Sequence, residues 1–227
     1  MYPVGTLRAA NRYLLTANML PDPIAQYIEE LVPPRHPVLA EMEAVAARDQ
    51  FPIIGPACGH FCYLLARLTG ARRIFELGSG FGYSTAWFAR AVRENGGGAV
   101  HHCVWDEGLS SRARDYLRRM DLSDVVQFHV GEAVATLRET PGPFDLIFND
   151  IDKSGYPGSL GAINQRIRPG GLLITDNMLW HGRILDQSDT SEATQGVREL
   201  TRMVWEDRDW IPAIVPLRDG LLVARHR

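Results

Sequence analysis

Three side chains that could bind a metal ion follow two apolar runs of the sequence. Asp150 comes after the run 144–148, and Asp176 and Asn177 come directly after the run 171–175. Carboxylate and amide oxygens suit a hard divalent cation, Mg²⁺ first and Ca²⁺ or Mn²⁺ as alternatives. The other interpretation is a pair of Asx turns, which are common where strands end.

Lys153 lies three residues after Asp150 and is the only lysine of the chain. A neighbouring dication would favour the uncharged form of its amine, which could then act as a general base. The alternative is a solvated surface lysine. Lys153 and Asp150 are therefore the candidate catalytic residues.

A glycine loop precedes these residues. Gly78, Gly80 and Gly82 stand at alternate positions after the apolar run 74–77. Glycine lets a backbone come close to a ligand, and the helix expected from Ser84 onward presents its N-terminus to that ligand. Dinucleotide-binding loops have the spacing G-x-G-x-x-G, so the spacing G-x-G-x-G disfavours a dehydrogenase.

Glu76 lies two residues before the first glycine. A carboxylate there would repel a pyrophosphate and attract the ammonium group of an amino-acid-bearing cofactor. This favours S-adenosylmethionine as the cofactor. The alternative is a tight turn that binds nothing.

Two further acidic residues follow expected strands. Asp106 ends the second strand and is placed to accept hydrogen bonds from ribose hydroxyls, although Glu107 could do the same and Asp106 could instead cap a helix. Glu132 and Ala133 follow the third strand, where the Glu132 carboxylate and the Ala133 N–H could meet adenine. The alternative for Glu132 is a favourable charge in the first turn of a helix.

The elements that must position these residues alternate between strands and helices, which is typical of a doubly wound α/β fold. We expect a Rossmann-like, mostly parallel seven-stranded sheet that ends in an antiparallel C-terminal hairpin. The expected strands are 74–77, 100–105, 125–130, 144–148, 171–175, 211–216 and 220–225, and the expected helices include 61–68, 112–120 and 190–207. Residues 1–50 read as a helical extension, with Thr6 as the first cap, before a core over 51–227; together they form a single expected domain.

The composition is that of an ordinary globular protein. The chain has 227 residues, 45% hydrophobic and 22% charged, with a net charge of −3, which gives no reason to expect a nucleic-acid partner. No apolar run approaches the roughly 18 residues of a membrane span, so we expect no membrane partner. The N-terminus lacks the pattern of a signal peptide, and three cysteines suit a reducing cytoplasm.

Cys58 and Cys62 flank His60 in the sequence. A metal site is one interpretation. The favoured one is that both cysteines are small apolar residues packed on a helix.

The sequence resembles the cation-dependent class I O-methyltransferases, the family that includes the caffeoyl-CoA and catechol methyltransferases and bacterial relatives. The resemblance covers nearly the whole chain from about residue 52. Its motifs are E-L-G at 76–78, G-Y-S at 82–84, D-I-D-K at 150–153, D-N-M-L-W-H-G at 176–182 and P-L-R-D-G-L at 216–221.

The resemblance implies a role for each candidate residue. S-adenosylmethionine would be held by Glu76, Gly78, Ser84, Asp106, Ala133 and Asp152, together with the neighbouring Ser79, Gly80, Glu132 and Asp150. The divalent cation would be held by Asp150, Asp176 and Asn177, and the substrate, a phenolic small molecule, by Lys153, Asn177, Trp180 and His181. The resemblance also implies a homodimer.

The expected activity is methyl transfer to one hydroxyl of a catechol-like molecule. Two alternatives remain open. One is methylation of a hydroxylated tRNA base, for which Arg112, Arg114, Arg118 and Arg119 offer a basic cluster. The other is a non-catalytic protein that binds S-adenosylmethionine.

Overall fold

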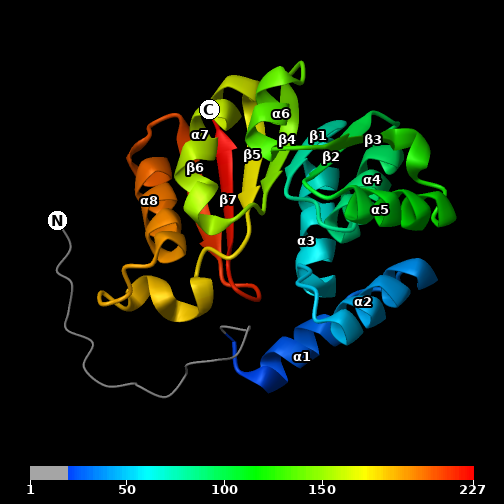
Figure 1. Cartoon of the computed structure of the whole chain (residues 1–227), viewed down its shortest axis with the longest axis horizontal. Helices are drawn as coiled ribbons and strands as arrows, with labels where there is room; N and C mark the ends of the chain where they lie inside the picture. The colour runs from blue at the N-terminus through cyan, green and yellow to red at the C-terminus, as the bar shows by residue number, and fades with distance from the viewer. Residues whose placement is uncertain (1–19) are drawn as a thin grey trace.

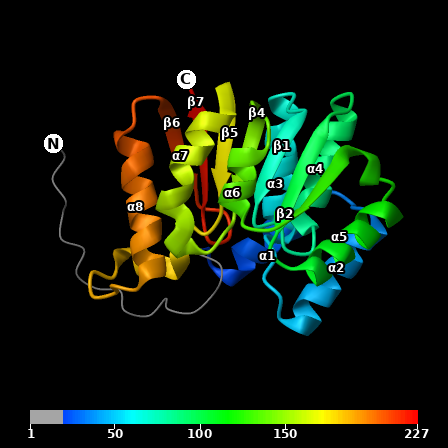
Figure 2. The same ribbon diagram turned by 45° about the horizontal axis from the view of Figure 1, so that its top comes forward.

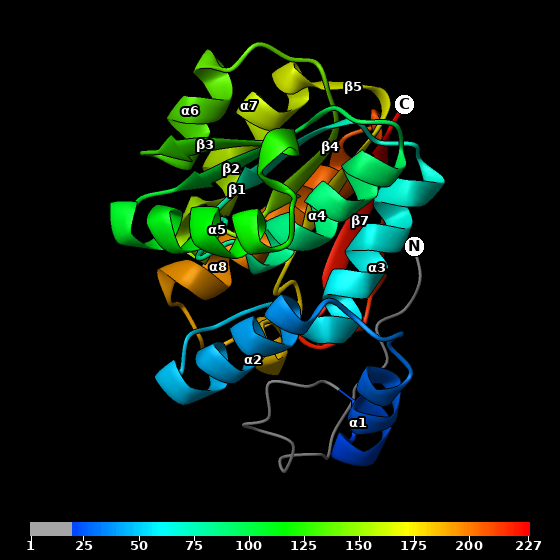
Figure 3. The same cartoon turned by 90° about the vertical axis from the view of Figure 1, so that its right-hand side faces the viewer.

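The computed structural model describes residues 20–227, in which a central sheet lies between two layers of helices (Figure 3). The strand order is β3-β2-β1-β4-β5-β7-β6 (Figure 1). The strands are β1 Arg73–Leu77, β2 Ala99–Val104, β3 Val126–Val130, β4 Phe144–Asn149, β5 Ile167–Thr175, β6 Trp210–Val215 and β7 Leu221–His226. β1 to β5 pair in parallel, and β7 is antiparallel to both β5 and β6. The predicted fold is confirmed.

The sheet is buried on both faces because helices cover both. α3 (Gly55–Leu68), α4 (Tyr83–Glu94) and α5 (Glu107–Arg119) lie on one face, and α6 (Ala133–Glu139) and α7 (Tyr156–Arg166) on the other (Figure 3). α8 (Glu192–Glu206) continues the second layer beside α7 (Figure 2). Each face of the sheet therefore packs against its own hydrophobic core. In β1, Ile74 packs into one core and its neighbour Phe75 into the other.

Two helices of the N-terminal extension are described, α1 (Asp22–Glu30) and α2 (Pro37–Asp49). Figure 1 shows them at one end of the sheet, below the two helical layers. α2 buries Val38, Leu39, Met42 and Ala46 in the same core as α3 and α4, whereas α1 buries no residue. The predicted Thr6 cap lies outside the described residues.

The prediction missed α7, which forms in a stretch that holds Pro157, Gly158 and Gly161. These residues weaken the helical pattern, but proline is tolerated in the first turn of a helix. β5 begins at Ile167 rather than at 171, because a register shift against β4 accommodates the turn-like residues 168–171.

The cysteines behave as the favoured interpretation expected. Cys58, Cys62 and Cys103 are free and buried. Within residues 20–227, no three His, Cys, Asp or Glu side chains are grouped so that they could hold a metal ion. No helix in this part of the chain is long and apolar enough to cross a membrane.

Candidate active site

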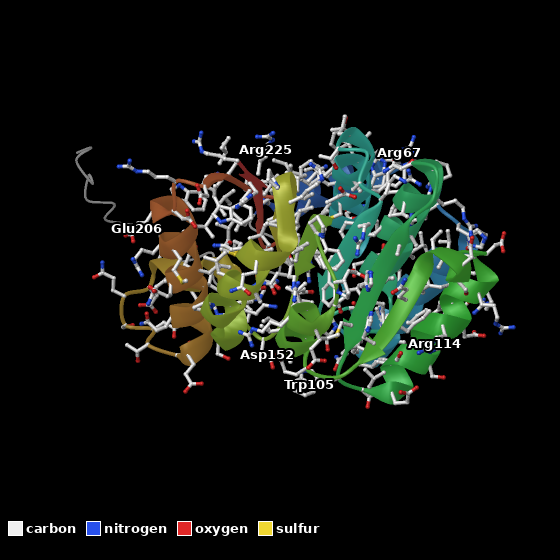
Figure 4. The ribbon with its side chains drawn as sticks, turned by 90° about the horizontal axis from the view of Figure 1, so that it is seen from above. Arg67, Trp105, Arg114, Asp152, Glu206 and Arg225 are labelled. Atoms are coloured by element: carbon white, nitrogen blue, oxygen red, sulfur yellow. The ribbon has the colours of Figure 1, made fainter. Side chains whose placement is uncertain are left out.

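A cavity of about 300 Å³ opens at the carboxyl ends of the parallel strands, where ligands bind in doubly wound folds. Figure 4 shows Trp105, which follows β2, and Asp152, which follows β4, at the same edge of the sheet, with Arg67 and Arg225 at the opposite edge. Ten predicted site residues line the cavity, namely Gly78, Ser79, Gly80, Ser84, Ala133, Asp150, Asp152, Lys153, Asp176 and Asn177. The five that do not are Glu76, Asp106, Glu132, Trp180 and His181.

The glycine loop is fastened to its neighbours through the backbone. Gly78 has a φ of +87°, and a Cβ at this position would lie 2.5 Å from the carbonyl oxygen of Asp150. The next residue, Ser79, accepts a hydrogen bond at its Oγ from the Cys103 N–H (3.0 Å) and donates its own N–H to the Cys103 carbonyl (2.9 Å). The glycine loop therefore lies directly against the backbone of Asp150.

Glu76 is fully buried behind this loop, and neither of its carboxylate oxygens has a partner with hydrogen-bond geometry in the described part of the chain. Burial raises the pKa of Glu76 to about 7, against the opposing influence of the nearby Ser84, Thr85 and Ser79 hydroxyls. An unpaired buried carboxylate of this kind suits a cationic ligand. Its predicted contact with the cofactor ammonium stays a prediction.

Asp106 and Glu132 both cap helices. Asp106 is exposed and accepts a hydrogen bond from the Leu109 N–H (2.7 Å) at the start of α5. Glu132 accepts from the N–H groups of Val134 (2.9 Å) and Ala135 (2.5 Å) at the start of α6. For Asp106 this is the alternative that the sequence left open, whereas Glu132 is the N-cap of α6 and not a charge in its first turn. The predicted ribose and adenine contacts remain predictions.

Asp176 and Asp150 line the cavity from neighbouring strand ends, and each is paired with a cation. Lys153 Nζ lies 2.9 Å from Asp150 Oδ1, and Arg218 Nη1 lies 3.0 Å from Asp176 Oδ2. Burial, and then the charge of Asp150, raise the pKa of Asp176, while Arg218 lowers it. The second oxygen of Asp176, Oδ1, is buried and has no hydrogen-bond partner within residues 20–227.

Two carboxylates and one amide do not make up a group of three His, Cys, Asp or Glu side chains, but their chemical type suits a hard divalent cation. Asp150, Asp176 and Asn177 line one cavity and present only oxygen ligands of the type that Mg²⁺ prefers, and the unpartnered Asp176 Oδ1 leaves one buried acceptor to be satisfied. The Asn177 amide nitrogen is already used, since Nδ2 donates to Asp219 Oδ2 (3.1 Å). The predicted contact of Asn177 with an ion would therefore use its amide oxygen.

Left-handed backbone conformations gather around the site. The backbone φ angles are 56° at Asn177, 44° at Trp180, 53° at His181 and 53° at Arg218. Residues other than glycine rarely adopt this region. The buried carboxylate of Asp219 supports this turn by accepting hydrogen bonds from the His181 N–H (2.6 Å) and from Asn177. Such strain persists only where the surroundings hold it, and it is commonest at functional sites.

Lys153 is held by several groups. Besides Asp150, its amine donates to the Ile151 carbonyl (3.3 Å) and lies 5.5 Å from the centre of the Tyr156 ring and 5.9 Å from that of Trp180. Trp180 thus stands next to the candidate base although it does not line the cavity. His181 has a side chain 41% exposed, with Nδ1 3.7 Å from Asp219 Oδ1.

Sequence reasoning assigned no role to three parts of the cavity wall. One is the segment 51–54, which links α2 to α3. The second is Trp105, which is 69% exposed and lies directly after β2. An aromatic ring at the end of a strand could have indicated a surface on which a ligand stacks. The third is Arg218, which was quoted as part of a motif but given no function.

A glycine loop that opens a helix, a cavity at the carboxyl ends of parallel strands and an antiparallel strand between β5 and β6 define a cofactor-binding protein of the doubly wound α/β class. The profile of the O-methyltransferase family matches residues 29–227. The chain belongs to this family, which confirms the predicted enzyme class.

Relatives at the sequence level carry the same chemistry in their names. The chain is 34% identical over 193 residues to a catechol O-methyltransferase of Niastella koreensis, covering 82% of this chain and 86% of the relative. It is 31% identical over 186 residues to a catechol O-methyltransferase of Mycobacterium tuberculosis, covering 81% and 84%.

Solved structures of O-methyltransferases are similar to this chain over most of its length. An O-methyltransferase from Bacillus cereus in complex with SAH matches with a TM-score of 0.82 at 29% identity, over 90% of this chain and 97% of that one. The O-methyltransferase TomG from Streptomyces achromogenes, in complex with SAM, matches with a TM-score of 0.78 at 27% identity, over 90% and 96%.

Proposed function

We propose that this enzyme transfers a methyl group from S-adenosylmethionine to one hydroxyl of a catechol-like small molecule, with the help of a divalent cation. One observation carries the proposal. The three oxygen ligands Asp150, Asp176 and Asn177 and the amine of Lys153 line the same cavity as the glycine loop. The names of the catechol O-methyltransferase relatives and the SAH and SAM complexes of the structural neighbours support the acceptor and the cofactor.

The residues divide the work between two sides of the cavity. Gly78, Ser79, Gly80 and Ser84 would hold the cofactor near the N-terminus of α4, together with Asp152 and Ala133, which line the same cavity. Asp150, Asp176 and Asn177 would hold the cation, with Mg²⁺ as its proposed identity. When bound, the cofactor supplies an electrophilic methyl group and the cation lowers the pKa of an acceptor hydroxyl.

Lys153 acts on the proton. Its Nζ would take the proton of the acceptor hydroxyl, or stabilise the resulting phenolate, from its position beside Asp150 and the Trp180 ring. The remaining contribution is positioning, because reacting groups that are held about 3 Å apart in the right orientation gain many powers of ten in rate.

Removal of the cation tests the proposal. Methyl transfer to a panel of catechols should fall by about a hundredfold or more when EDTA is added and should return with excess Mg²⁺, because a metal supplies several kcal/mol of charge stabilisation. Asp150→Ala should abolish transfer while the dissociation constant for S-adenosylhomocysteine changes only a few-fold. Asp115→Ala, which removes an exposed carboxylate on α5, is the control and should behave as the wild type. Activity that is indifferent to EDTA would refute the metal role.

The proposed partners follow the same family. We propose a homodimer as the assembly and the cytoplasm as the compartment, the latter supported by three free buried thiols. A tRNA substrate is disfavoured because the basic cluster on α5 is already engaged within the protein. Arg118 and Arg119 form ion pairs with acidic side chains, and Arg112 and Arg114 lie over the rings of Phe81 and Phe128.

A further inference from the structure

Arg218 has a strained backbone conformation that the proposed reaction does not explain. It lies in the turn between β6 and β7 with a φ of +53°, in the left-handed region where a non-glycine residue costs free energy. The neighbouring Gly220 (φ +84°) shows that this turn can hold glycine. An arginine that persists here therefore needs a compensating interaction.

The interaction is with Asp176. Arg218 Nη1 donates to Asp176 Oδ2 at 3.0 Å, and the side chains of the two residues are 21% and 2% exposed. Asp176 Oδ1 is left buried without a partner within residues 20–227. The guanidinium thus satisfies half of a carboxylate that the proposed function assigns to a divalent cation.

A second carboxylate, that of Glu29, lies near Arg218. A small cavity between α1 and the β6–β7 turn is lined by both Arg218 and Glu29. Glu29 Oε2 accepts the Ala57 N–H (3.1 Å), whereas its Oε1 has no hydrogen bond with the part of the chain that is described. Burial raises the pKa of Glu29, and the charge of Arg218 is among the influences that lower it.

We propose that Arg218 is a resident cation that a divalent ion must displace from Asp176, and that Glu29 of α1 receives the displaced guanidinium. This inference rests on the proposed function, because it assumes that a divalent cation binds at Asp150, Asp176 and Asn177. Two like charges cannot share one small site without repulsion, so the ion and the guanidinium compete for Asp176. The competition sets the affinity for the ion, and the new ion pair with Glu29 ties α1 to the filled site.

Direct binding of Mn²⁺ tests the exchange. The free Mn²⁺ signal in electron paramagnetic resonance gives the dissociation constant for the full chain saturated with S-adenosylhomocysteine, without any measurement of turnover. Arg218→Gly removes the competitor and takes the left-handed backbone without strain, so Mn²⁺ should bind about tenfold more tightly or better, the scale of one hydrogen bond to a charged group. Arg218→Asn, which also tolerates this backbone, should give the same direction.

Glu29→Gln tests the receiving side. Removing the acceptor should weaken Mn²⁺ binding by roughly twofold to fivefold, the range of a partly exposed ion pair. In the double variant R218G/E29Q the second substitution should have no further effect, because no guanidinium remains to be received. Asp121→Gly relieves another left-handed residue (φ 56°), which lines neither cavity, and is the control, with unchanged Mn²⁺ affinity expected.

The outcomes separate the two proposals. If Mn²⁺ binds the wild type and both Arg218 variants equally, the exchange is wrong and the proposed metal-dependent function stands. If Mn²⁺ binds none of them, both fail. Binding to R218G and R218N but not to the wild type would overturn both, because Arg218 would then exclude the ion from the natural chain instead of yielding to it.

Discussion

The carboxyl group of Glu76 is completely buried. Its side chain is 0% exposed and burial raises its pKa to about 7, from an ordinary value of 4.5. The folded protein therefore holds this proton at pH values where the unfolded chain has released it. The contribution of Glu76 to stability is complete below pH 4.5 and is lost as the pH rises through 7.

A pair of unfolding curves measures this contribution. The free energy of unfolding of the cofactor-free wild type, relative to that of Glu76→Gln, should fall by roughly 2 kcal/mol between pH 5 and pH 8, because the variant carries no charge to bury. Urea denaturation at the two pH values is the measurement. Glu192→Gln, an exposed position in the first turn of α8, is the matched control. A difference between wild type and Glu76→Gln that stays constant with pH would contradict the burial of a charge.

For single residues, the sequence predicts the chemical role of a side chain better than it predicts which other side chains will contact it. Asp150, Asp176 and Asn177 could be recognised because oxygen ligands at strand ends have a direct meaning. The ion pair between Arg218 and Asp176 could not, since the two residues are 42 positions apart and meet only when β7 pairs with β5.

Among the elements, α8 fixes the position of the candidate base from the far side of the chain. Gly196 lies in α8, and a Cβ at this position would be 2.0 Å from the carbonyl oxygen of Lys153. The helix can approach Lys153–Gly155 so closely only because residue 196 has no side chain. The position of the Lys153 amine thus depends on a glycine 43 residues away.

Gly196→Ala should therefore displace the Lys153 segment. We expect a loss of about 1–3 kcal/mol in the free energy of unfolding, as for overpacked sites, together with a fall in kcat. The affinity for S-adenosylhomocysteine should change little, because the glycine loop lies on other strands. Isothermal titration and steady-state kinetics separate the two effects.

Gly161→Ala in α7 is the control for that change. A Cβ at Gly161 meets no described atom within 4 Å, so alanine should raise stability by about 0.5–1 kcal/mol and leave kcat unaltered. Full activity in Gly196→Ala would show that the contact does not position the base.

The arrangement of elements was largely predictable because parallel strands that are buried on both faces read as continuous apolar runs. This gave the sheet, and the shared edge at the carboxyl ends gave ten residues of the cavity wall. α7 was missed because Gly158 and Gly161 interrupt the helical pattern. The place of Gly196 was beyond prediction because its meaning depends on a tertiary contact.

The whole molecule presents an apolar surface on α1. Ile24 and Tyr27 of α1 are 50% and 61% exposed, Leu31 at its C-cap is 62% exposed, and the helix buries none of its residues. Clustered exposed apolar side chains commonly mark an interface. They support the proposed homodimer, whereas the proposed division of one domain into a head over 1–50 and a core over 51–227 stays a prediction.

Size-exclusion chromatography with light scattering tests whether the protein is a dimer. The wild type should have twice the chain mass of 25.4 kDa, and Tyr27→Glu should shift it toward the mass of one chain, because a charge would be buried in the interface. Trp205→Glu changes an exposed aromatic residue (48%) on α8 and should leave the mass unchanged. A wild type with the mass of a single chain would remove the dimer from consideration.

The single lysine of the chain has a practical consequence. Its side chain is 14% exposed and lies in the cavity wall beside Asp150, so reagents that acylate amines find no other lysine to modify. Coupling the enzyme to a resin or a dye through lysine would consume the amine that the proposed reaction needs. Attachment through its abundant arginines or through an added tag leaves that amine intact.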